Sequence, residues 1–248
     1  MGHLEDDRSV IYKNLYLLSL VVIVFIIGVL TPFVSRKLNE TLTADEVYKN
    51  TFGSVVEIKA VTGEDESYGS AVCVSNDGKF LTNAHVVAYS TKNESFETIT
   101  KTFDHYFIRF PDCENFEEVT LEKFDINKDL AIVKLNNINR KLNVLKISTT
   151  YETGEKCYAV GNLQNYGVSI SEGVISKKAV NIENNGRIIN AIQCDLTITE
   201  GNSGGALISK CGELIGITTF RTKDLSGKII YGMSFSIPSN VVLEFIGK

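Results

Sequence analysis

A chain of 248 residues with 44% hydrophobic and 22% charged residues has the composition of an ordinary globular protein, without a low-complexity tract. Its net charge of −5 at pH 7, with no concentrated basic face, argues against nucleic-acid binding. The length exceeds one average domain but fits a two-lobed β domain of about 200 residues. Val, Ile, Thr, Phe and Tyr recur in short runs separated by Gly, Asn and Asp, which favours β-structure.

The N-terminal region contains one long apolar segment. Residues 14–35 carry no charge, and as a helix this stretch would span about 33 Å, close to the ~30 Å hydrocarbon thickness of a membrane. The alternative is a cleaved signal peptide, whose apolar region is shorter and is followed by a small-x-small cleavage site. Thr31-Pro32-Phe33-Val34 fits such a site poorly. We therefore expect a transmembrane anchor over residues 14–35, preceded by a short tail over residues 1–13.

The orientation of this anchor does not follow from its flanking charges. Arg8 and Lys13 precede it and Arg36 and Lys37 follow it, so the positive-inside rule does not decide between the two directions. We place the N-terminus in the cytoplasm and the body on the extracytoplasmic side, because the chemistry described below belongs with an exported body.

The chain after the anchor is a linker followed by strands. Within the linker, residues 36–50, the pattern Thr43-x-x-Glu46 is typical of a capping box and predicts a short helix to about residue 50. The polar stretch 90–105 interrupts the rhythm of the strands and predicts a surface loop. Residues 136–150 lack strong periodicity and are expected to link two halves of the body.

A predicted hairpin places one histidine on a regular element. An apolar strand over residues 69–74 is followed by the turn signal Asn76-Asp77-Gly78 and by a second apolar strand over residues 79–87. His85 falls where this second strand ends. Of the three histidines, one precedes the anchor and His105 lies in the loop-like stretch. Only His85 is therefore predicted to lie on a regular secondary-structure element. A structural histidine at a strand end is the alternative to a catalytic base.

The candidate acid stands directly before another strand. Asp129 precedes the apolar run Leu130–Leu135. A carboxylate anchored in this way can hold an imidazole in the required tautomer and stabilise its charged form. An acid that only caps a turn is the alternative, and Asp125 is the nearby competitor, although it lacks an apolar strand immediately behind it.

The most specific pattern is the run Gly201-Asn202-Ser203-Gly204-Gly205. A serine hydroxyl is a weak nucleophile and needs an adjacent base, here His85. Flanking glycines allow a sharp turn of the main chain, so we predict an oxyanion hole made of the backbone N–H groups of Gly201, Asn202 and Ser203. A Gly-rich turn between strands is the structural alternative, but His, Asp and Ser occur in the order of a known triad lineage.

Several motifs together resemble the HtrA/Deg family of serine proteases, in family order over residues 47–245. They are Thr82-Asn83-Ala84-His85-Val86-Val87, Asp129-Leu130-Ala131, Gly161-Asn162, Ser171–Ser176, Gln193-x-Asp195, Gly201–Gly205, Gly212–Ile217 and Phe235–Pro238. The resemblance implies an all-β, chymotrypsin/trypsin-like fold of two perpendicular six-stranded barrels, the first over residues 51–140 and the second over residues 141–248. It also implies a serine endopeptidase that cleaves unfolded or specific exported proteins, with no metal and no organic cofactor.

The family also provides expectations about control and assembly. Relatives commonly carry a PDZ domain after the protease, and because this sequence ends at Lys248 we expect that control to be absent. Relatives often form trimers through N-terminal segments that match poorly here, so the oligomeric state stays open. Asn202, rather than Asp, precedes Ser203, which argues against activation by cleavage of a zymogen. The alternative function is a non-catalytic, holdase-like binding module on the same fold, against which the intact Ser, His and glycines argue.

The resemblance also predicts the pocket for the substrate side chain before the scissile bond. Its walls are expected to be Thr197, Ile198, Thr199, Thr218, Thr219, Phe220 and Arg221. Thr197 stands at the floor position in place of an acid, and Ile198 and Phe220 make the pocket small and apolar. We therefore expect cleavage after Val, Ile, Ala, Leu or Thr. Asp195 would favour Lys or Arg only if it swung toward the pocket, and we expect it to face away.

The five cysteines are widely spaced and include no C-x-x-C pair, so we expect neither a zinc site nor a thioredoxin-type centre. Their odd number leaves at least one thiol without a partner in the same chain. We expect buried free thiols that act as small hydrophobic groups.

Overall fold

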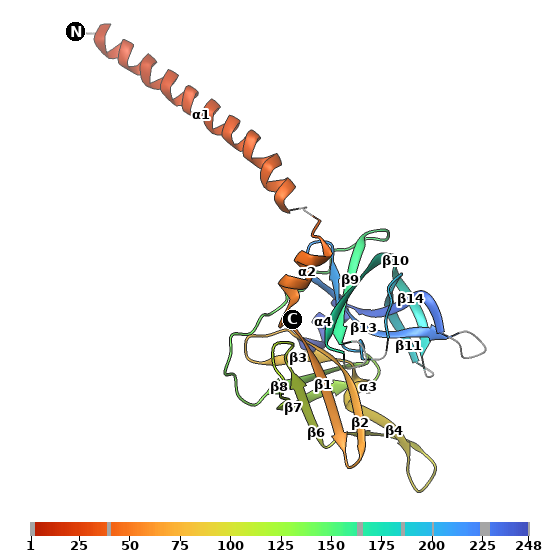
Figure 1. The fold of residues 1–248 in the computed structure, drawn as a ribbon. Coiled ribbons are helices and arrows are strands. Elements are labelled where there is room, and N and C mark those ends of the chain that lie inside the picture. The colour runs from red at the N-terminus through yellow and green to blue at the C-terminus, as the bar shows by residue number, and fades with distance from the viewer. Residues whose placement is uncertain are drawn as a thin grey trace. The chain divides into compact units, whose positions relative to one another are not determined.

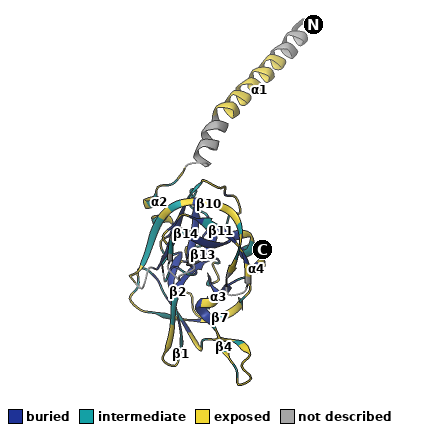
Figure 2. Cartoon of the chain, turned by 90° about the vertical axis from the view of Figure 1, so that its right-hand side faces the viewer, coloured by how far each residue is buried: buried dark blue, intermediate teal, exposed yellow. Residues whose placement is uncertain are grey.

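The computed structural model describes residues 3–38, 41–162, 166–184, 187–199, 201–223 and 229–247, and the chain divides into two units, residues 1–41 and 42–248. In the first unit α1 (His3–Leu38) is one continuous helix that contains the expected anchor. Its segment Tyr12–Val29 is long and apolar enough to cross a membrane, and its side chains are exposed (Figure 2). A helix of this kind near the N-terminus fits either an anchor or a signal sequence.

The second unit opens with α2 (Ala44–Thr51), and the predicted capping box is confirmed. The Thr43 hydroxyl accepts from the Glu46 N–H at 3.3 Å, and the Glu46 carboxylate accepts from the Thr43 N–H at 2.8 Å. Two N–H groups that the helix cannot satisfy itself are thus paired. The helix buries Val47 and Thr51 against the body.

The first barrel consists of six antiparallel strands in the order β1-β2-β3-β8-β7-β6, closed by pairing of β6 with β1 (Figure 1). The strands are β1 (Val55–Thr62), β2 (Asp65–Cys73), β3 (Lys79–Thr82), β6 (His105–Arg109), β7 (Glu117–Asp125) and β8 (Leu130–Leu135). The predicted turn between β2 and β3 is present, with Gly78 at a φ of 85° that favours glycine.

The second barrel repeats this plan with the order β10-β11-β14-β13-β12-β9, closed by pairing of β9 with β10 (Figure 1). Its strands are β9 (Lys156–Asn162), β10 (Val168–Asn184), β11 (Arg187–Cys194), β12 (Ala206–Ser209), β13 (Leu214–Lys223) and β14 (Ile229–Pro238), and α4 (Ser239–Ile246) follows. The expected fold of two six-stranded barrels is confirmed.

A continuous apolar core joins the two barrels. It contains residues of β1, β2, β3 and β8 from the first barrel, of β9, β12, β13 and β14 from the second, and of both flanking helices α2 and α4: Val47, Val55, Val72, Leu81, Leu130, Ile132, Tyr158, Val160, Ala206, Ile208, Leu214, Ile217, Ile237, Val242 and Phe245 among others. Each barrel has a further core of its own. Because packed apolar interiors resist displacement, this shared core fixes the barrels relative to each other and hence the two halves of the site.

Two local predictions were wrong. The second strand of the first hairpin ends at Thr82, and residues Ala84–Val87 form the helical turn α3. The stretch 90–105 is not a plain loop, because β4 (Ala88–Lys92) and β5 (Thr98–Thr102) form a two-stranded sheet and His105 begins β6. Most side chains of β4 and β5 are at least partly exposed on both faces. Such strands lack the apolar alternation that identifies a half-buried strand.

Candidate active site

His85 lies on α3, the single helical turn that follows β3. The turn is closed by the Val86 N–H, which donates to the Asn83 carbonyl at 3.2 Å, and Val86 and Val87 are buried in the core of the first barrel. Because these neighbours point inward, the His85 side chain lies at the surface with 46% of its area exposed. A base in this position is accessible to a substrate.

Asp129 lies in a tight turn immediately before β8. Its φ of 52° is in the left-handed region, which Asp tolerates better than most residues. The competing acid, Asp125, shapes this turn: its Oδ1 accepts from the N–H groups of Asn127 at 2.8 Å and Lys128 at 3.1 Å. Asp125 therefore caps the turn, and Asp129 is the acid that reaches His85.

The carboxylate of Asp129 makes a dense set of contacts with His85. Its Oδ2 lies 2.9 Å and its Oδ1 3.0 Å from the His85 Nδ1, and Oδ1 also accepts from the His85 N–H at 3.0 Å. An ionised carboxylate only accepts hydrogen bonds, so the ring proton resides on Nδ1 and Nε2 is left as the basic nitrogen.

The environment of His85 also changes its basicity. The protein around the imidazole displaces part of its water, which by itself would lower the pKa of His85, but the charge of Asp129 and the hydrogen bond from Nδ1 to its carboxylate act in the opposite direction. Together the last two effects outweigh this loss of water and hold the pKa of His85 above its ordinary value of 6.5. The group is therefore a stronger base than a free imidazole.

Ser203 comes to this pair from the second barrel, in the loop before β12. Its hydroxyl donates to the Thr219 carbonyl at 2.9 Å and so is not directed to His85 in this structure. The hydroxyl of the same residue, Thr219, donates to Oδ2 of Asp129 at 2.7 Å. Thr219 thus connects Ser203 to Asp129.

This role of Thr219 was missed in the sequence, where the residue was assigned to the substrate pocket. A threonine inside a β-strand gives no local signal of a hydrogen bond across 90 residues of chain. Thr219 is only 2% exposed, so its hydroxyl faces the interior of the site.

The backbone N–H groups around Ser203 differ in availability. The Asn202 N–H donates to the Thr199 carbonyl at 3.1 Å and the Gly204 N–H to the Thr218 carbonyl at 2.9 Å. Within the described part of the chain, the N–H groups of Gly201 and Ser203 have no backbone partner. Of the three N–H groups predicted to form an oxyanion hole, that of Asn202 therefore already has a carbonyl partner, whereas those of Gly201 and Ser203 have no backbone partner among the described residues.

The loop around Ser203 requires glycines for two reasons: their backbone conformation and the close approach of the loop to the first barrel. Gly204 has a φ of +84°, and a Cβ at this position would lie 2.1 Å from the Ser70 carbonyl oxygen and 2.3 Å from Thr82 Oγ1. Gly201 also has a positive φ, of 92°. The loop can therefore lie directly against the first barrel only because these residues lack side chains.

The residues predicted for the substrate pocket are differently placed. Thr197 is exposed, whereas Ile198 is buried in the core of the second barrel. Thr218 is 1% exposed, and its hydroxyl donates to the Asn202 carbonyl at 2.5 Å. The side chains of Phe220 and Arg221 lie outside the described residues. Asp195 is exposed, and its Oδ1 lies 2.9 Å from where a Cβ of Gly232 would be.

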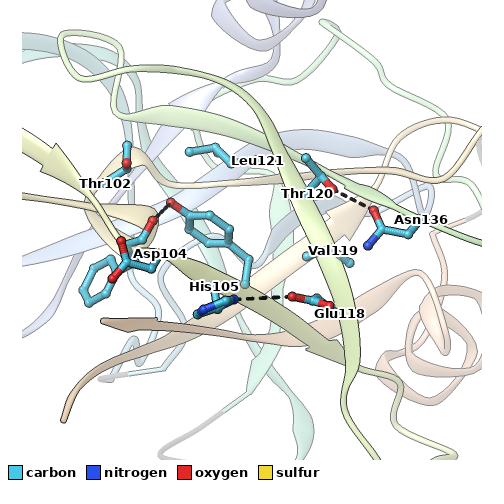
Figure 3. Close-up of a pocket in the computed structure, with 10 residues that line it drawn as sticks. Thr102, Asp104, His105, Glu118, Val119, Thr120, Leu121 and Asn136 are labelled. Carbon is cyan, nitrogen blue, oxygen red and sulfur yellow. Dashed lines mark hydrogen bonds and ion pairs between the residues drawn. The ribbon is translucent and has the colours of Figure 1, made fainter. Parts of the chain in front are cut away.

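The other histidine of the body, His105, lines a separate open pocket of about 440 Å³ that is formed by the end of β5, by β6 and β7, and by Asn136 after β8. Figure 3 shows its ring opposite the carboxylate of Glu118, with Nδ1 and Oε1 3.4 Å apart. Both side chains are more than half exposed, so the pair is a solvated surface contact. None of the residues predicted for catalysis lines this pocket.

Cysteines and possible metal ligands form no further centre in the part of the chain that the structure describes. The five cysteines are free thiols, of which Cys73, Cys157 and Cys194 are buried and Cys113 and Cys211 are partly exposed. No group of three or more His, Cys, Asp or Glu side chains in the described ranges is arranged to hold a metal ion.

Comparison with known families gives a match over most of the two barrels. The family model described as "Trypsin-like peptidase domain" matches residues 69–217, a range that includes His85, Asp129 and Ser203.

Individual proteins give the same result. The chain is 30% identical over 208 residues to serine endoprotease DegS of Haemophilus influenzae, a match that covers 82% of this chain and 56% of the relative. It is 34% identical over 186 residues to a probable periplasmic serine endoprotease, DegP-like, of Buchnera aphidicola, covering 73% and 36%. The solved structure of the HtrA-type protease AlgW with tripeptide superposes with a TM-score of 0.69 at 28% identity, covering 83% of this chain and 63% of that chain. The chain thus spans little more than half, or less, of the length of these curated relatives.

Proposed function

The chain belongs to the HtrA/Deg family of trypsin-like serine proteases, and we propose that it is an endopeptidase in which His85, Asp129 and Ser203 cleave unfolded or exported polypeptides. The observation that carries this proposal is the contact between His85 Nδ1 and the Asp129 carboxylate at 2.9 Å. It leaves Nε2 unprotonated on the exposed side of a strengthened base, where a serine hydroxyl can be activated.

The first step is attack by Ser203 on the scissile carbonyl carbon. For this the hydroxyl turns from the Thr219 carbonyl to His85 Nε2, which takes its proton while the Ser203 oxygen forms a bond to carbon. Asp129 stabilises the imidazolium that results. The electron pair of the carbonyl moves to its oxygen, and the N–H groups of Ser203 and Gly201 bind that developing charge.

The intermediate then collapses in two stages. His85 gives its proton to the leaving amine as the C–N bond breaks, and the acyl group remains on Ser203. A water molecule next attacks the acyl carbon and gives a proton to His85. When the bond to Ser203 breaks, His85 returns that proton to the serine oxygen, and the product leaves as a carboxylic acid that ionises in water. The protons exchanged with Ser203, the leaving amine and the attacking water all pass through His85 Nε2.

Labelling of the full-length protein in detergent with a fluorophosphonate tests this proposal. We expect covalent labelling of the wild type, hydrolysis of an unfolded protein such as casein, and loss of both in Ser203→Ala. A folded wild-type protein that neither labels nor cleaves would support the non-catalytic, holdase-like alternative.

We further propose that α1 anchors the protein in a membrane, with the peptidase body on the extracytoplasmic side. The length and apolar composition of Tyr12–Val29 support a membrane span, and the DegP-like relative is named as periplasmic. Alkaline carbonate extraction should leave the full-length protein in the membrane, and added protease should digest the body only from the extracytoplasmic side. A soluble product with a new N-terminus after residue 30 would identify a signal peptide instead.

For the substrate we propose an apolar side chain before the scissile bond. The support is that Thr197 rather than an acid occupies the expected floor and that Asp195 lies beside Gly232 of β14. Discrimination among aliphatic residues should be modest, roughly 10- to 200-fold, because each methylene contributes only a few kcal/mol. A peptide library should show cleavage after Val, Ile, Ala, Leu or Thr. Dominant cleavage after Arg or Lys would contradict this and would implicate Asp195.

A further inference from the structure

Ser70, in β2 of the first barrel, makes four hydrogen bonds although it is fully buried. Its hydroxyl donates to the Gly201 carbonyl at 2.7 Å and accepts from the Asn162 N–H at 2.8 Å. Its N–H donates to the Ser203 carbonyl at 2.8 Å, and its own carbonyl accepts from the Thr82 hydroxyl at 2.7 Å. One residue of the first barrel thus holds two carbonyls of the nucleophile loop.

These contacts determine how two peptide planes of the loop are oriented. The carbonyl of the peptide between Gly201 and Asn202 is bound by Ser70, and its N–H is bound by the Thr199 carbonyl. The carbonyl of the peptide between Ser203 and Gly204 is bound by Ser70 as well, and its N–H is bound by the second barrel at β13. A peptide unit is planar, so a bond at each end fixes the direction of the whole unit.

The peptide between these two is the one that carries the Ser203 N–H. Its carbonyl, that of Asn202, accepts from the Gly205 N–H at 2.9 Å and from the Thr218 hydroxyl at 2.5 Å. Its N–H has no backbone partner within the described ranges. With both flanking peptides fixed and its own carbonyl bound twice, the Ser203 N–H is held in one direction.

We infer that Ser70 is a positioning residue for the oxyanion hole. Its hydroxyl orients the Gly201 carbonyl, and the Ser203 N–H is thereby preorganised for the negative charge that develops on the substrate oxygen. This inference deepens the proposed peptidase function and rests on it. Preorganised donors of this kind are valuable because they need no rearrangement during the reaction.

The orientation of the Gly201 carbonyl depends on the side chain of Ser70 rather than on its backbone. The backbone bond from the Ser70 N–H to the Ser203 carbonyl does not use the side chain, whereas the bond to the Gly201 carbonyl requires the Ser70 hydroxyl. Space is limited, since a Cβ on Gly161 would lie 3.1 Å from Ser70 Oγ. The bond from Thr82 ties Ser70 to β3, the strand that leads to His85, so one piece of scaffold supports both the base and the oxyanion hole.

The test compares Ser70→Ala with Ser54→Ala in the full-length protein. Ser54 is a matched control, because its hydroxyl is equally buried in the first barrel and has no hydrogen-bond partner in the described structure. The fluorophosphonate titrates the active sites, and turnover is expressed per titrated site so that misfolded protein does not count. Removal of a direct oxyanion donor costs about 10²- to 10³-fold in kcat, so removal of its support should cost roughly 10- to 100-fold, with KM unchanged.

A second readout distinguishes positioning from general damage. A peptide aldehyde forms a reversible adduct with Ser203 whose oxygen occupies the oxyanion hole, whereas the matching peptide alcohol forms no adduct. Ser70→Ala should weaken aldehyde binding by the same factor as kcat and leave alcohol binding unchanged. Ser54→Ala should leave both ligands unaffected.

Each outcome decides the inference. If the wild type neither labels nor cleaves, the proposed peptidase function fails. If the wild type is active but Ser70→Ala has the same turnover per site and the same aldehyde affinity, only the inference about Ser70 is overturned. A parallel loss of aldehyde and alcohol binding would also overturn it. If Ser70→Ala does not fold, Ser70→Cys replaces it: its weaker donor should give an intermediate loss, and wild-type turnover would contradict the inference.

Discussion

The two barrels have the same strand plan but contribute to the site in different ways. The first barrel presents His85 on the helical turn α3 and Asp129 in the turn immediately before β8, and the contacts between them lie within that barrel. The second barrel presents Ser203 in a loop in which the carbonyls of Gly201 and Ser203 are bound by Ser70 of the first barrel, while the Gly204 N–H is bound by β13 of the second barrel. The contact between His85 and Asp129 is therefore built within one barrel, whereas the position of Ser203 depends on the junction between the two barrels.

This difference indicates how substitutions in each region should affect the site. A change in the first barrel acts on the base or the acid directly, whereas a change at the junction acts on the direction of the nucleophile loop. Four experiments test the distinction.

The largest loss of activity is expected for the two residues, one from each barrel, between which we propose that a proton is transferred. Ser203→Ala, His85→Ala and the double variant should all lose activity by on the order of 10⁶-fold, because each residue is ineffective without the other. Steady-state kcat/KM on an unfolded protein measures this loss, with unchanged thermal unfolding as the control. Losses that multiply in the double variant would show that the two barrels do not act as one unit.

Next comes the acid within the first barrel. Asp129→Asn should reduce kcat by roughly 10⁴-fold, because an amide can donate to Nδ1 and stabilise the wrong tautomer of His85. Asp125→Asn is the matched control: its side-chain oxygen can still accept from Asn127 and Lys128, so the turn should persist with little loss. A crippled Asp125→Asn beside an active Asp129→Asn would mean that the acid has been assigned to the wrong residue.

At the junction itself, Gly204→Ala should destabilise the protein by about 3 kcal/mol or more, since an unfavourable φ adds to a clash with the first barrel. Gly154→Ala separates the cost of the unfavourable φ from the cost of the clash. Gly154 has a similar φ of +88° but nothing lies within 4 Å of the added Cβ, so only the conformational cost of about 1–2 kcal/mol remains. Urea unfolding measures both. Equal losses in the two variants would remove the evidence that the loop is pressed against Ser70.

The smallest effect concerns pH. The base must be unprotonated, so kcat/KM should rise with pH through the pKa of His85, which lies above 6.5. In Asp129→Asn the charge and the carboxylate hydrogen bond that raise this pKa are both lost, and the midpoint of the residual profile should move to lower pH. A pH–rate profile with NMR titration of His85 tests the shift. A midpoint that moves upward would show that Asp129 does not stabilise the imidazolium.

Much of the site could be predicted from the sequence because the segments that hold its residues have local sequence signals. The turn at Gly78, the apolar run after Asp129 and the glycine cluster around Ser203 mark where the chain must turn or extend, and the structure has the expected elements there. The capping box of α2 is local in the same sense, since both of its bonds join residues three apart.

Other features were decided only by tertiary structure. The strand expected through Val87 becomes a helical turn, and the polar strands β4 and β5 carry no alternating pattern that would reveal them. The hydroxyl of Ser70 meets the Gly201 carbonyl across 131 positions of sequence, and that of Thr219 meets Asp129 across 90. Closure of two barrels around a shared core brings these groups together. A hydrogen bond between an uncharged hydroxyl and a distant backbone or carboxylate oxygen imposes no periodic pattern on the neighbouring residues. Such a bond therefore cannot be predicted from the sequence alone.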